Sequence, residues 1–143
     1  MIIVDVNMLL YATIDGFAEH PRARRWWEQL VNGTRLVGLA SPAVFGFLRM
    51  ATNPRIFDNA MSVDEATRRV EGWLQQPQVR YVTPGPRHLE LAFSLLRQAG
   101  AAASLTTDAQ LAALAMELQG EVHSNDADFS RFAGLRWVNP LAA

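Results

Sequence analysis

The sequence predicts an α/β fold, a three-layer α/β/α sandwich with a central, mainly parallel sheet. Short β-branched runs alternate along the chain with segments of helical periodicity, which is the pattern of parallel strands joined by crossover helices. The chain has 143 residues, of which 50% are hydrophobic, and this length and composition suit one domain with a sizeable core. We expect a single domain over residues 1–143, without repeats or a linker.

Five short segments are expected to be strands. Ile2–Val4 is the clearest, because three consecutive β-branched residues are typical of a strand buried on both faces. The other four are residues 36–39, 79–82, 121–124 and 135–138.

Helices are expected between the strands, and some have clear start and stop signals. Ser62 and Glu65 form a capping box, Gly100 is a typical stop residue, and Thr107 is expected to cap the helix that ends at Gly120. The other predicted helices cover residues 7–14, 20–32, 42–51, 62–76 and 86–99, with a short helical turn over 128–132.

Several side chains are given structural roles. A buried face of the third helix is expected to hold Val44, Phe45, Phe47 and Leu48, and the amphipathic helix 86–99 carries Leu89, Phe93 and Leu96. His88 is interpreted as a first-turn surface residue and His123 as structural. Of Trp26 and Trp27, one is expected in the core, and the other is either partly exposed or part of a protein interface.

Asp5 is the first residue that the fold class leaves unexplained. It follows an apolar strand of a buried sheet, where an unpaired carboxylate is costly. Turn or cap chemistry does not account for an acid within an apolar run. Because open α/β sheets bind ligands at the carboxyl ends of their strands, Asp5 is expected to have a functional role.

Three further aspartates are expected to converge on the same edge. Asp126 and Asp128 follow a predicted strand, and Asp108 lies at a helix start; taken singly, a turn or a helix N-terminus explains each of them. Gathered together, the carboxylates repel one another unless a cation is present. All-oxygen ligands suit Mg²⁺ or Mn²⁺, and such an ion commonly activates water for attack on a phosphoryl group.

Composition narrows the function classes. The absence of Cys excludes disulfides, zinc–thiolate sites and a thiol nucleophile, and it is consistent with a cytoplasmic location. The net charge of −1 argues against indiscriminate nucleic-acid binding, but it becomes +3 when the four aspartates are left out. Phosphate contacts are predicted for four arginines, although a solvated helix face explains each one better singly: Arg49, Arg55, Arg131 and Arg136.

The aspartates described above, and the residues around them, follow one another along the chain as in the motifs of PIN-domain nucleases. The sequence resembles in particular the VapC-type toxins of bacterial toxin–antitoxin pairs. The resemblance spans essentially the whole chain. Its motifs are Asp5-x-Asn7, Thr107-Asp108-Ala109, the segment from Ser124 to Phe129, the stretch from Gly46 to Arg55, and Phe132-x-Gly134-Leu135-Arg136-Trp137.

The resemblance implies a PIN-like homodimer and an endoribonuclease dependent on Mg²⁺ or Mn²⁺. Its substrates would be structured RNAs such as tRNA or rRNA, and a cognate VapB-type antitoxin would neutralise it; no membrane partner is implied. Asp5, Asp108 and Asp126 match the catalytic, metal-binding acids and Asp128 an auxiliary metal ligand. The matching polar supports are Asn7, Thr107 and Ser124. Gly46 departs from the pattern, because many PIN domains have a glutamate there.

Two alternatives stay open at this point. A PIN-like fold with metal affinity weakened by Gly46 would bind RNA or a protein without cutting. A Mg²⁺-dependent phosphohydrolase with Asp5 as nucleophile is disfavoured, because such enzymes commonly have a second Asp where this chain has Asn7, and they need a lysine, which this chain lacks.

Overall fold

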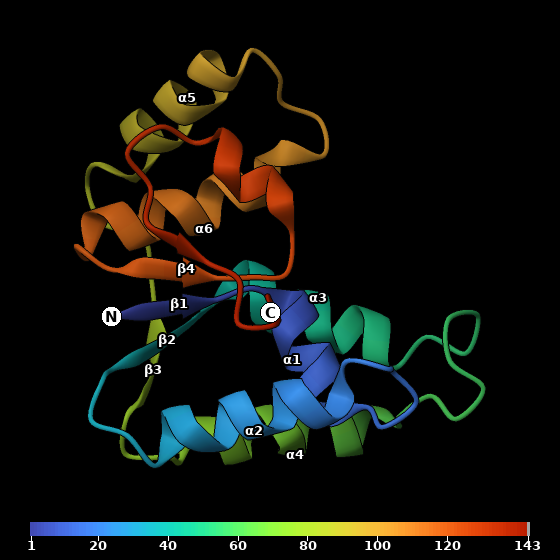
Figure 1. Ribbon diagram of the computed structural model, residues 1–143. Coiled ribbons are helices and arrows are strands. Elements are labelled where there is room, and N and C mark those ends of the chain that lie inside the picture. Colours follow the sequence, from blue (N-terminus) through green and yellow to red (C-terminus); the bar gives the residue numbers. More distant parts are fainter. Residues whose placement is uncertain (143) are drawn as a thin grey trace.

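The computed structural model describes residues 1–142 and has a five-stranded sheet at its centre (Figure 1). The strands are β1 (Ile2–Val4), β2 (Val37–Ala40), β3 (Val79–Val82), β4 (Glu121–His123) and β5 (Trp137–Val138). They lie in the order β3-β2-β1-β4-β5, and all four pairings are parallel. The predicted α/β/α sandwich is confirmed.

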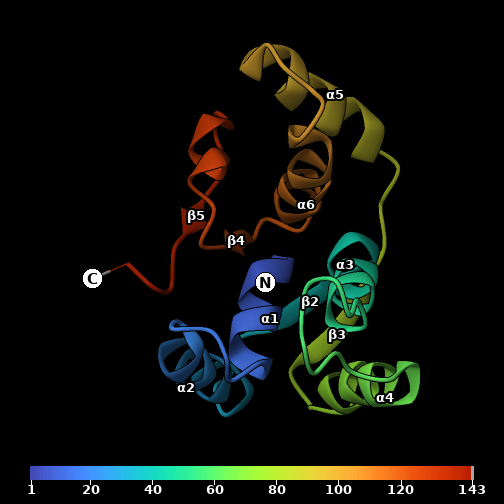
Figure 2. The ribbon, with the colours of Figure 1, turned by 90° about the vertical axis from the view of Figure 1, so that its right-hand side faces the viewer.

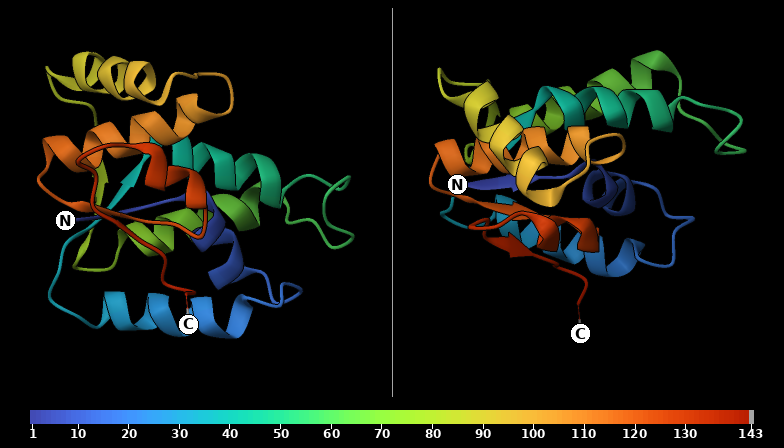
Figure 3. Two further views of the ribbon diagram at one scale, coloured as in Figure 1. Left: turned by 45° about the horizontal axis from the view of Figure 1, so that its top comes forward. Right: turned by 90° about the horizontal axis from the view of Figure 1, so that it is seen from above.

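Helices cover both faces of this sheet (Figures 1 and 3). One side carries α1 (Val6–Thr13), α2 (His20–Val31), α3 (Ser41–Ala51) and α4 (Val63–Leu74), and the other carries α5 (His88–Ala99), α6 (Leu105–Glu117) and the 3₁₀ turn η1 (Ala127–Arg131). Within residues 1–142, none of these helices has the length and apolar character needed to cross a membrane.

Strand side chains divide between two cores because successive residues of a strand point to opposite faces. Ile2 and Val4 pack with the residues of α1–α4, whereas Ile3 packs with α5 and α6. All three are fully buried. This two-sided burial explains why β1 is a continuous apolar run rather than an alternating one.

The residues predicted to begin or end helices do so in the structure, except in α6. Ser62 and Glu65 form the expected capping box, and Gly100 ends α5 in the left-handed conformation with φ +71°. Thr107 does not cap α6, because the helix begins two residues earlier, at Leu105. Leu105 is buried in the core of the α5–α6 face, and the longer helix places it there.

Three other side-chain predictions are wrong. Phe45 is 62% exposed, because α3 buries its neighbours Val44 and Phe47 and turns position 45 outward. On α5 the buried face carries Ala92 and Leu95, which leaves both Leu89 and Phe93 exposed.

His88 is also misplaced by the prediction, since it is buried rather than on the surface. Its Nδ1 lies 3.2 Å from Glu117 Oε1, so it joins α5 to α6. The open alternatives for the tryptophans are also decided: Trp26 is buried in the core, and half-buried Trp27 packs at its edge, with ring centroids 5.9 Å from Trp73.

Candidate metal centre

Asp5 lies where β1 ends and α1 begins, and it has two structural partners. Its Oδ1 accepts a hydrogen bond of 2.7 Å from the backbone N–H of Val6, as the N-cap of α1. Its Oδ2 accepts a 2.6 Å hydrogen bond from the Ser124 hydroxyl. Cap chemistry therefore accounts for part of the role of Asp5, contrary to the interpretation of the sequence, which missed that α1 begins directly after it.

The Ser124 hydroxyl links Asp5 to the segment that holds Asp126 through hydrogen bonds. It donates to Asp5 and accepts hydrogen bonds from Asn7 Nδ2, at 3.2 Å, and from the Asp126 backbone N–H, at 2.9 Å. A hydroxyl offers one donor and two acceptor positions, so all are used. Ser124 is fully buried, and this arrangement fixes the end of β4 to the start of α1.

Asn7 completes this support from the first turn of α1. Its Oδ1 accepts a 3.3 Å hydrogen bond from the backbone N–H of Asn125, while its amide reaches Ser124. Asn7 and Ser124 therefore lie directly beneath the acids, as expected. Thr107 is exposed on α6 and makes no hydrogen bond to an aspartate among residues 1–142.

Asp108, Asp126 and Asp128 meet at the carboxyl edge of the sheet. One carboxylate oxygen from each lies within 4.8 Å of the other two. Asp126 is the N-cap of η1, where its Oδ1 accepts a 2.9 Å hydrogen bond from the backbone N–H of Asp128. Figure 2 looks onto this edge, where α1, the start of α6 and the segment after β4 surround the same region.

Burial and mutual repulsion raise two carboxyl pKa values at this edge. The pKa of Asp108 is raised to about 7, first by burial and then by the charges of Asp5, Asp126 and Asp128. The pKa of Asp5 is also raised, by burial and by the charge of Asp126, although the hydrogen bonds from Ser124 and Val6 oppose this. The charges of Asp5, Asp126 and Asp128 therefore all act on the Asp108 carboxyl.

The donor set fits a hard divalent cation. Among residues 1–142 none of these four aspartates forms an ion pair with a basic side chain, so their repulsion is not offset by the chain itself. Carboxylate oxygens are the ligands that Mg²⁺ and Mn²⁺ prefer. Asp108, Asp126 and Asp128 are arranged to hold such an ion, with Asp5 beside them.

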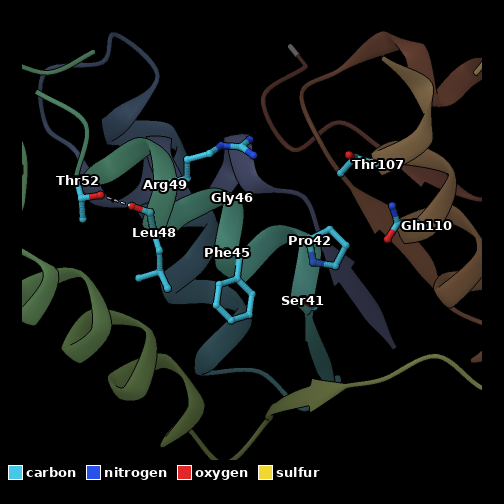
Figure 4. Close-up of a pocket in the computed structure, with 9 residues that line it drawn as sticks. All are labelled: Ser41, Pro42, Phe45, Gly46, Leu48, Arg49, Thr52, Thr107 and Gln110. Carbon is cyan, nitrogen blue, oxygen red and sulfur yellow. Dashed lines mark hydrogen bonds between the residues drawn. The ribbon is translucent and has the colours of Figure 1, made fainter. Parts of the chain in front are cut away.

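A groove of about 660 Å³ lies between α3 and α6 (Figure 4). Arg49 and Gly46 of α3 lie on one side of it and Thr107 and Gln110 of α6 on the other. Asp108 directly follows Thr107 in α6, so one acid of the cluster is the chain neighbour of a residue that lines the groove. Its other lining residues are Ser41, Pro42, Phe45, Leu48 and Thr52.

Gly46 leaves the place of the missing glutamate empty. A Cβ atom built on Gly46 would lie 3.2 Å from Val6 Cγ2, so a side chain there would leave α3 toward the first turn of α1. That turn begins at Asp5. The position is thus close to the acidic edge, but no carboxylate of α3 reaches it.

The predicted phosphate-binding arginines do not share one place. Arg49 lines the groove, whereas Arg55 lies in the loop between α3 and α4, which projects from the sheet (Figure 3). Arg131 is in η1 and donates to the Ala99 carbonyl at 3.3 Å. Arg136 precedes β5 and donates to the Gln119 carbonyl after α6, which places it at the opposite, amino edge of the sheet.

His123 is structural, as expected. Its Nδ1 accepts a 3.0 Å hydrogen bond from Trp26 Nε1, so the ring proton is on Nε2, which donates to Glu121 Oε1 at 2.9 Å. Burial lowers the pKa of His123. Both ring nitrogens are occupied, and the imidazole takes no part in the acidic cluster.

Comparison with known proteins gives one consistent result. The sequence profile of the PIN domain matches residues 2–135. The chain is 51% identical over 141 residues to ribonuclease VapC33 of Mycobacterium tuberculosis, covering 99% of each chain. It is 37% identical over 142 residues to ribonuclease VapC37 of the same organism, again covering 99% of each.

Solved structures give the same fold at low identity. VapC20 of M. tuberculosis, described as a toxin that cleaves the sarcin–ricin loop, superposes with a TM-score of 0.68 at 20% identity, covering 95% of this chain and 99% of the other. VapBC2 from Rickettsia felis, bound to a DNA fragment from its promoter, superposes with a TM-score of 0.72 at 15% identity, over 97% and 98% of the two chains.

Proposed function

The chain belongs to the PIN-domain family and, within it, to the VapC ribonucleases, and on this premise we propose that it is a Mg²⁺-dependent endoribonuclease toxin acting on structured RNA. This proposal rests on one arrangement of charges. Carboxylate oxygens of Asp108, Asp126 and Asp128 lie within 4.8 Å of one another, and the charge of Asp5 acts on Asp108 as well. No basic side chain among residues 1–142 forms an ion pair with these acids. Mn²⁺ would serve in place of Mg²⁺, since both take oxygen ligands.

Each residue then has a defined part. Asp108 and Asp126 would hold the metal ion, and Asp128 would contribute its carboxylate from the exposed side. Asp5 supplies charge from the end of β1, with one oxygen oriented by Ser124. When bound, the metal ion supplies activated water and stabilises charge that develops on the phosphate.

The remaining polar residues position the acids and the substrate. Ser124 and Asn7 fix the end of β4 against α1, which sets the distance between Asp5 and Asp126. Arg49 lines the groove, where its guanidinium is suited to a phosphate of the RNA. Arg55 and Arg131 would contact the RNA farther from the cut.

The expected partners follow from the same family. VapBC toxin–antitoxin complexes are among the solved structures that share this fold, and we propose that a VapB-type antitoxin neutralises this chain by covering the acidic edge. A homodimer in the cytoplasm is the proposed working form, and residues 1–143 are proposed to act as one domain.

Cleavage of RNA by the purified, antitoxin-free protein tests the function. Total bacterial RNA would be incubated with Mg²⁺, Mn²⁺ or EDTA, with Asp5→Ala and Asp108→Ala as variants and with the product ends mapped. We expect metal-dependent cuts that leave 5′-phosphate and 3′-hydroxyl ends and that both variants lose. A 2′,3′-cyclic phosphate product would contradict the mechanism.

The same experiment tests the binding-module alternative, which Gly46 favours. RNA that binds equally well in EDTA and is never cut would support that alternative. The three converging carboxylates argue against it, because a binding surface for a polyanion does not need an uncompensated negative cluster.

A further inference from the structure

Phe45 is an exposed aromatic side chain of α3. Its side chain lines the groove between α3 and α6 and is 62% exposed. Among residues 1–142 it packs against no other aromatic ring. Aromatic side chains in positively charged grooves are the surfaces on which the bases of single-stranded nucleic acids stack, and neither the fold nor the metal centre uses this one.

The residues around Phe45 are those that a nucleotide requires. Arg49 follows it by one helical turn on α3 and is exposed, and in the described part of the chain its guanidinium forms no ion pair. Thr107 and Gln110 face α3 from the other side of the groove (Figure 4). The groove thus offers one aromatic surface, one cation and several hydrogen-bonding groups.

From this juxtaposition we propose that Phe45 stacks on an unpaired base of the RNA substrate while Arg49 contacts an adjacent phosphate. The proposal rests on the proposed function, since Asp108, which would hold the metal, directly follows Thr107 of the groove. A volume of about 660 Å³ is in the range of small-molecule sites. Stacking on an aromatic ring tolerates any base, so Phe45 would select unpaired structure rather than sequence.

This arrangement makes a specific statement about the substrate class. A base within a duplex has both faces covered by its neighbours, whereas a base in a loop or bulge is free to stack on a side chain. The nucleotide that stacks on Phe45 would therefore have to be unpaired. Phe45 acts here as a positioning residue, because it contacts the substrate away from the reacting atoms.

Binding of an oligoribonucleotide with one 2-aminopurine tests the stacking directly. The full chain would be used with Ca²⁺ in place of Mg²⁺, and gels would check that the RNA stays intact. We expect the 2-aminopurine fluorescence to fall on binding to the natural protein and to Phe45→Tyr. Phe45→Leu and Phe45→Ala should lose this quenching and bind roughly tenfold more weakly.

The control is Phe93→Ala, which removes an exposed Phe (47% exposed) from α5, outside the groove. It should bind and quench like the natural protein. Phe45→Leu is the decisive variant, because it keeps an apolar side chain and removes only the ring. Natural affinity and quenching in Phe45→Leu would overturn the proposal.

A second measurement separates RNA from a protein occupant. Sedimentation would compare the natural chain with Phe45→Ala, and a change in oligomeric state would assign Phe45 to a contact between copies and overturn the proposal. Failure of the nuclease assignment is distinguishable, because it is seen in the cleavage assay as a natural protein that cuts no RNA or as an Asp108→Ala variant that cuts it normally. The fluorescence series needs no cleavage and decides the role of Phe45 in either case.

Discussion

Two polar groups lie on either side of the junction between His123 and Ser124, and they differ in how their charges are balanced. Below the junction, Glu121 accepts hydrogen bonds from both Arg35 and His123 at 2.9 Å, and Trp26 satisfies the other nitrogen of His123. Although burial acts to raise it, the pKa of Glu121 is lowered by these partners. This group is complete within the chain.

Above the junction, the aspartates have hydrogen-bond donors, but no basic side chain among residues 1–142 forms an ion pair with them. The Ser124 hydroxyl and the Val6 N–H orient the Asp5 carboxylate, and the Asp128 N–H orients that of Asp126, yet the pKa values of Asp5 and Asp108 are raised. For a buried carboxylate, satisfying its hydrogen bonds and balancing its charge are therefore separate requirements. Only the group that is left charged and unbalanced is suited to take up an ion from solution.

The largest effect is expected for Asp108→Asn, which keeps the shape of the side chain and removes one charge. Metal-dependent cleavage should fall roughly 100-fold or more, because a direct ligand is expected to matter at least as much as an outer-shell partner. RNA cleavage rates and Mn²⁺ titration calorimetry would measure it. Asp64→Asn on α4 is the matched control, and equal losses in both variants would contradict the assignment.

Ser124→Ala should weaken both sides of the comparison. It removes the only side-chain donor to Asp5 among residues 1–142, so Mn²⁺ affinity should fall roughly 10- to 100-fold. The free energy of unfolding should also drop by about 1–3 kcal/mol, because Asn7 and Asp126 lose an acceptor. Calorimetry and urea unfolding test both effects, and unchanged Mn²⁺ affinity would show that Ser124 only supports the fold.

The stability of the metal-free protein and its affinity for Mn²⁺ should change with pH in opposite directions. Because the folded-state pKa of Asp108, about 7, exceeds the ordinary value of 3.8 for an aspartate, the folded metal-free protein binds this proton more tightly than the unfolded chain does. Its stability should therefore fall as the pH rises from about 4 to about 7. Mn²⁺ affinity should rise over the same range, by about tenfold per pH unit if one proton is released.

Urea unfolding at several pH values, with and without Mn²⁺, would measure this coupling. Asp108→Asn should flatten the stability curve of the metal-free protein between pH 4 and 7. If the natural chain instead gains stability as the pH rises toward 7, the charge imbalance at the carboxyl edge is contradicted.

Trp26→Phe should affect only the balanced group. The variant keeps a ring in the core but leaves Nδ1 of buried His123 without its donor, which costs about 1–3 kcal/mol of unfolding free energy. Mn²⁺ affinity should not change, since the imidazole does not contact the aspartates. A large loss of Mn²⁺ affinity would show that the two groups are coupled through β4.

The smallest effect is expected for Gly46→Glu, which adds a carboxylate toward the acidic edge. Mn²⁺ affinity should rise by roughly two- to fivefold, an amount typical of one additional partly solvated charge. Val6 must shift slightly, because its Cγ2 lies 3.2 Å from the new Cβ. Gly46→Gln has nearly the same shape without the charge, and an equal affinity in both variants would refute a role for the carboxylate.

The order of strands and helices along the chain, and the meeting of Asp108, Asp126 and Asp128 at one edge, could be predicted from the sequence alone. Burial on both faces requires apolar β-branched runs such as Ile2–Val4, and strand ends in a parallel sheet share an edge. These are local patterns with a topological consequence, so Asp126 and Asp108 could be expected near each other. The capping box of Ser62 and the stop at Gly100 are local as well.

Which side chains are exposed and which partners they bind depends on the tertiary structure. Phe45 and Val44 are equally apolar in sequence, but the rotation of α3 against the core exposes one and buries the other. Likewise, Ser124 becomes the support of Asp5 through a hydrogen bond that spans 119 positions of the chain. Periodicity records which residues are apolar, whereas exposure and pairing depend on how the packed elements are oriented, and that orientation is fixed only when all of them pack together.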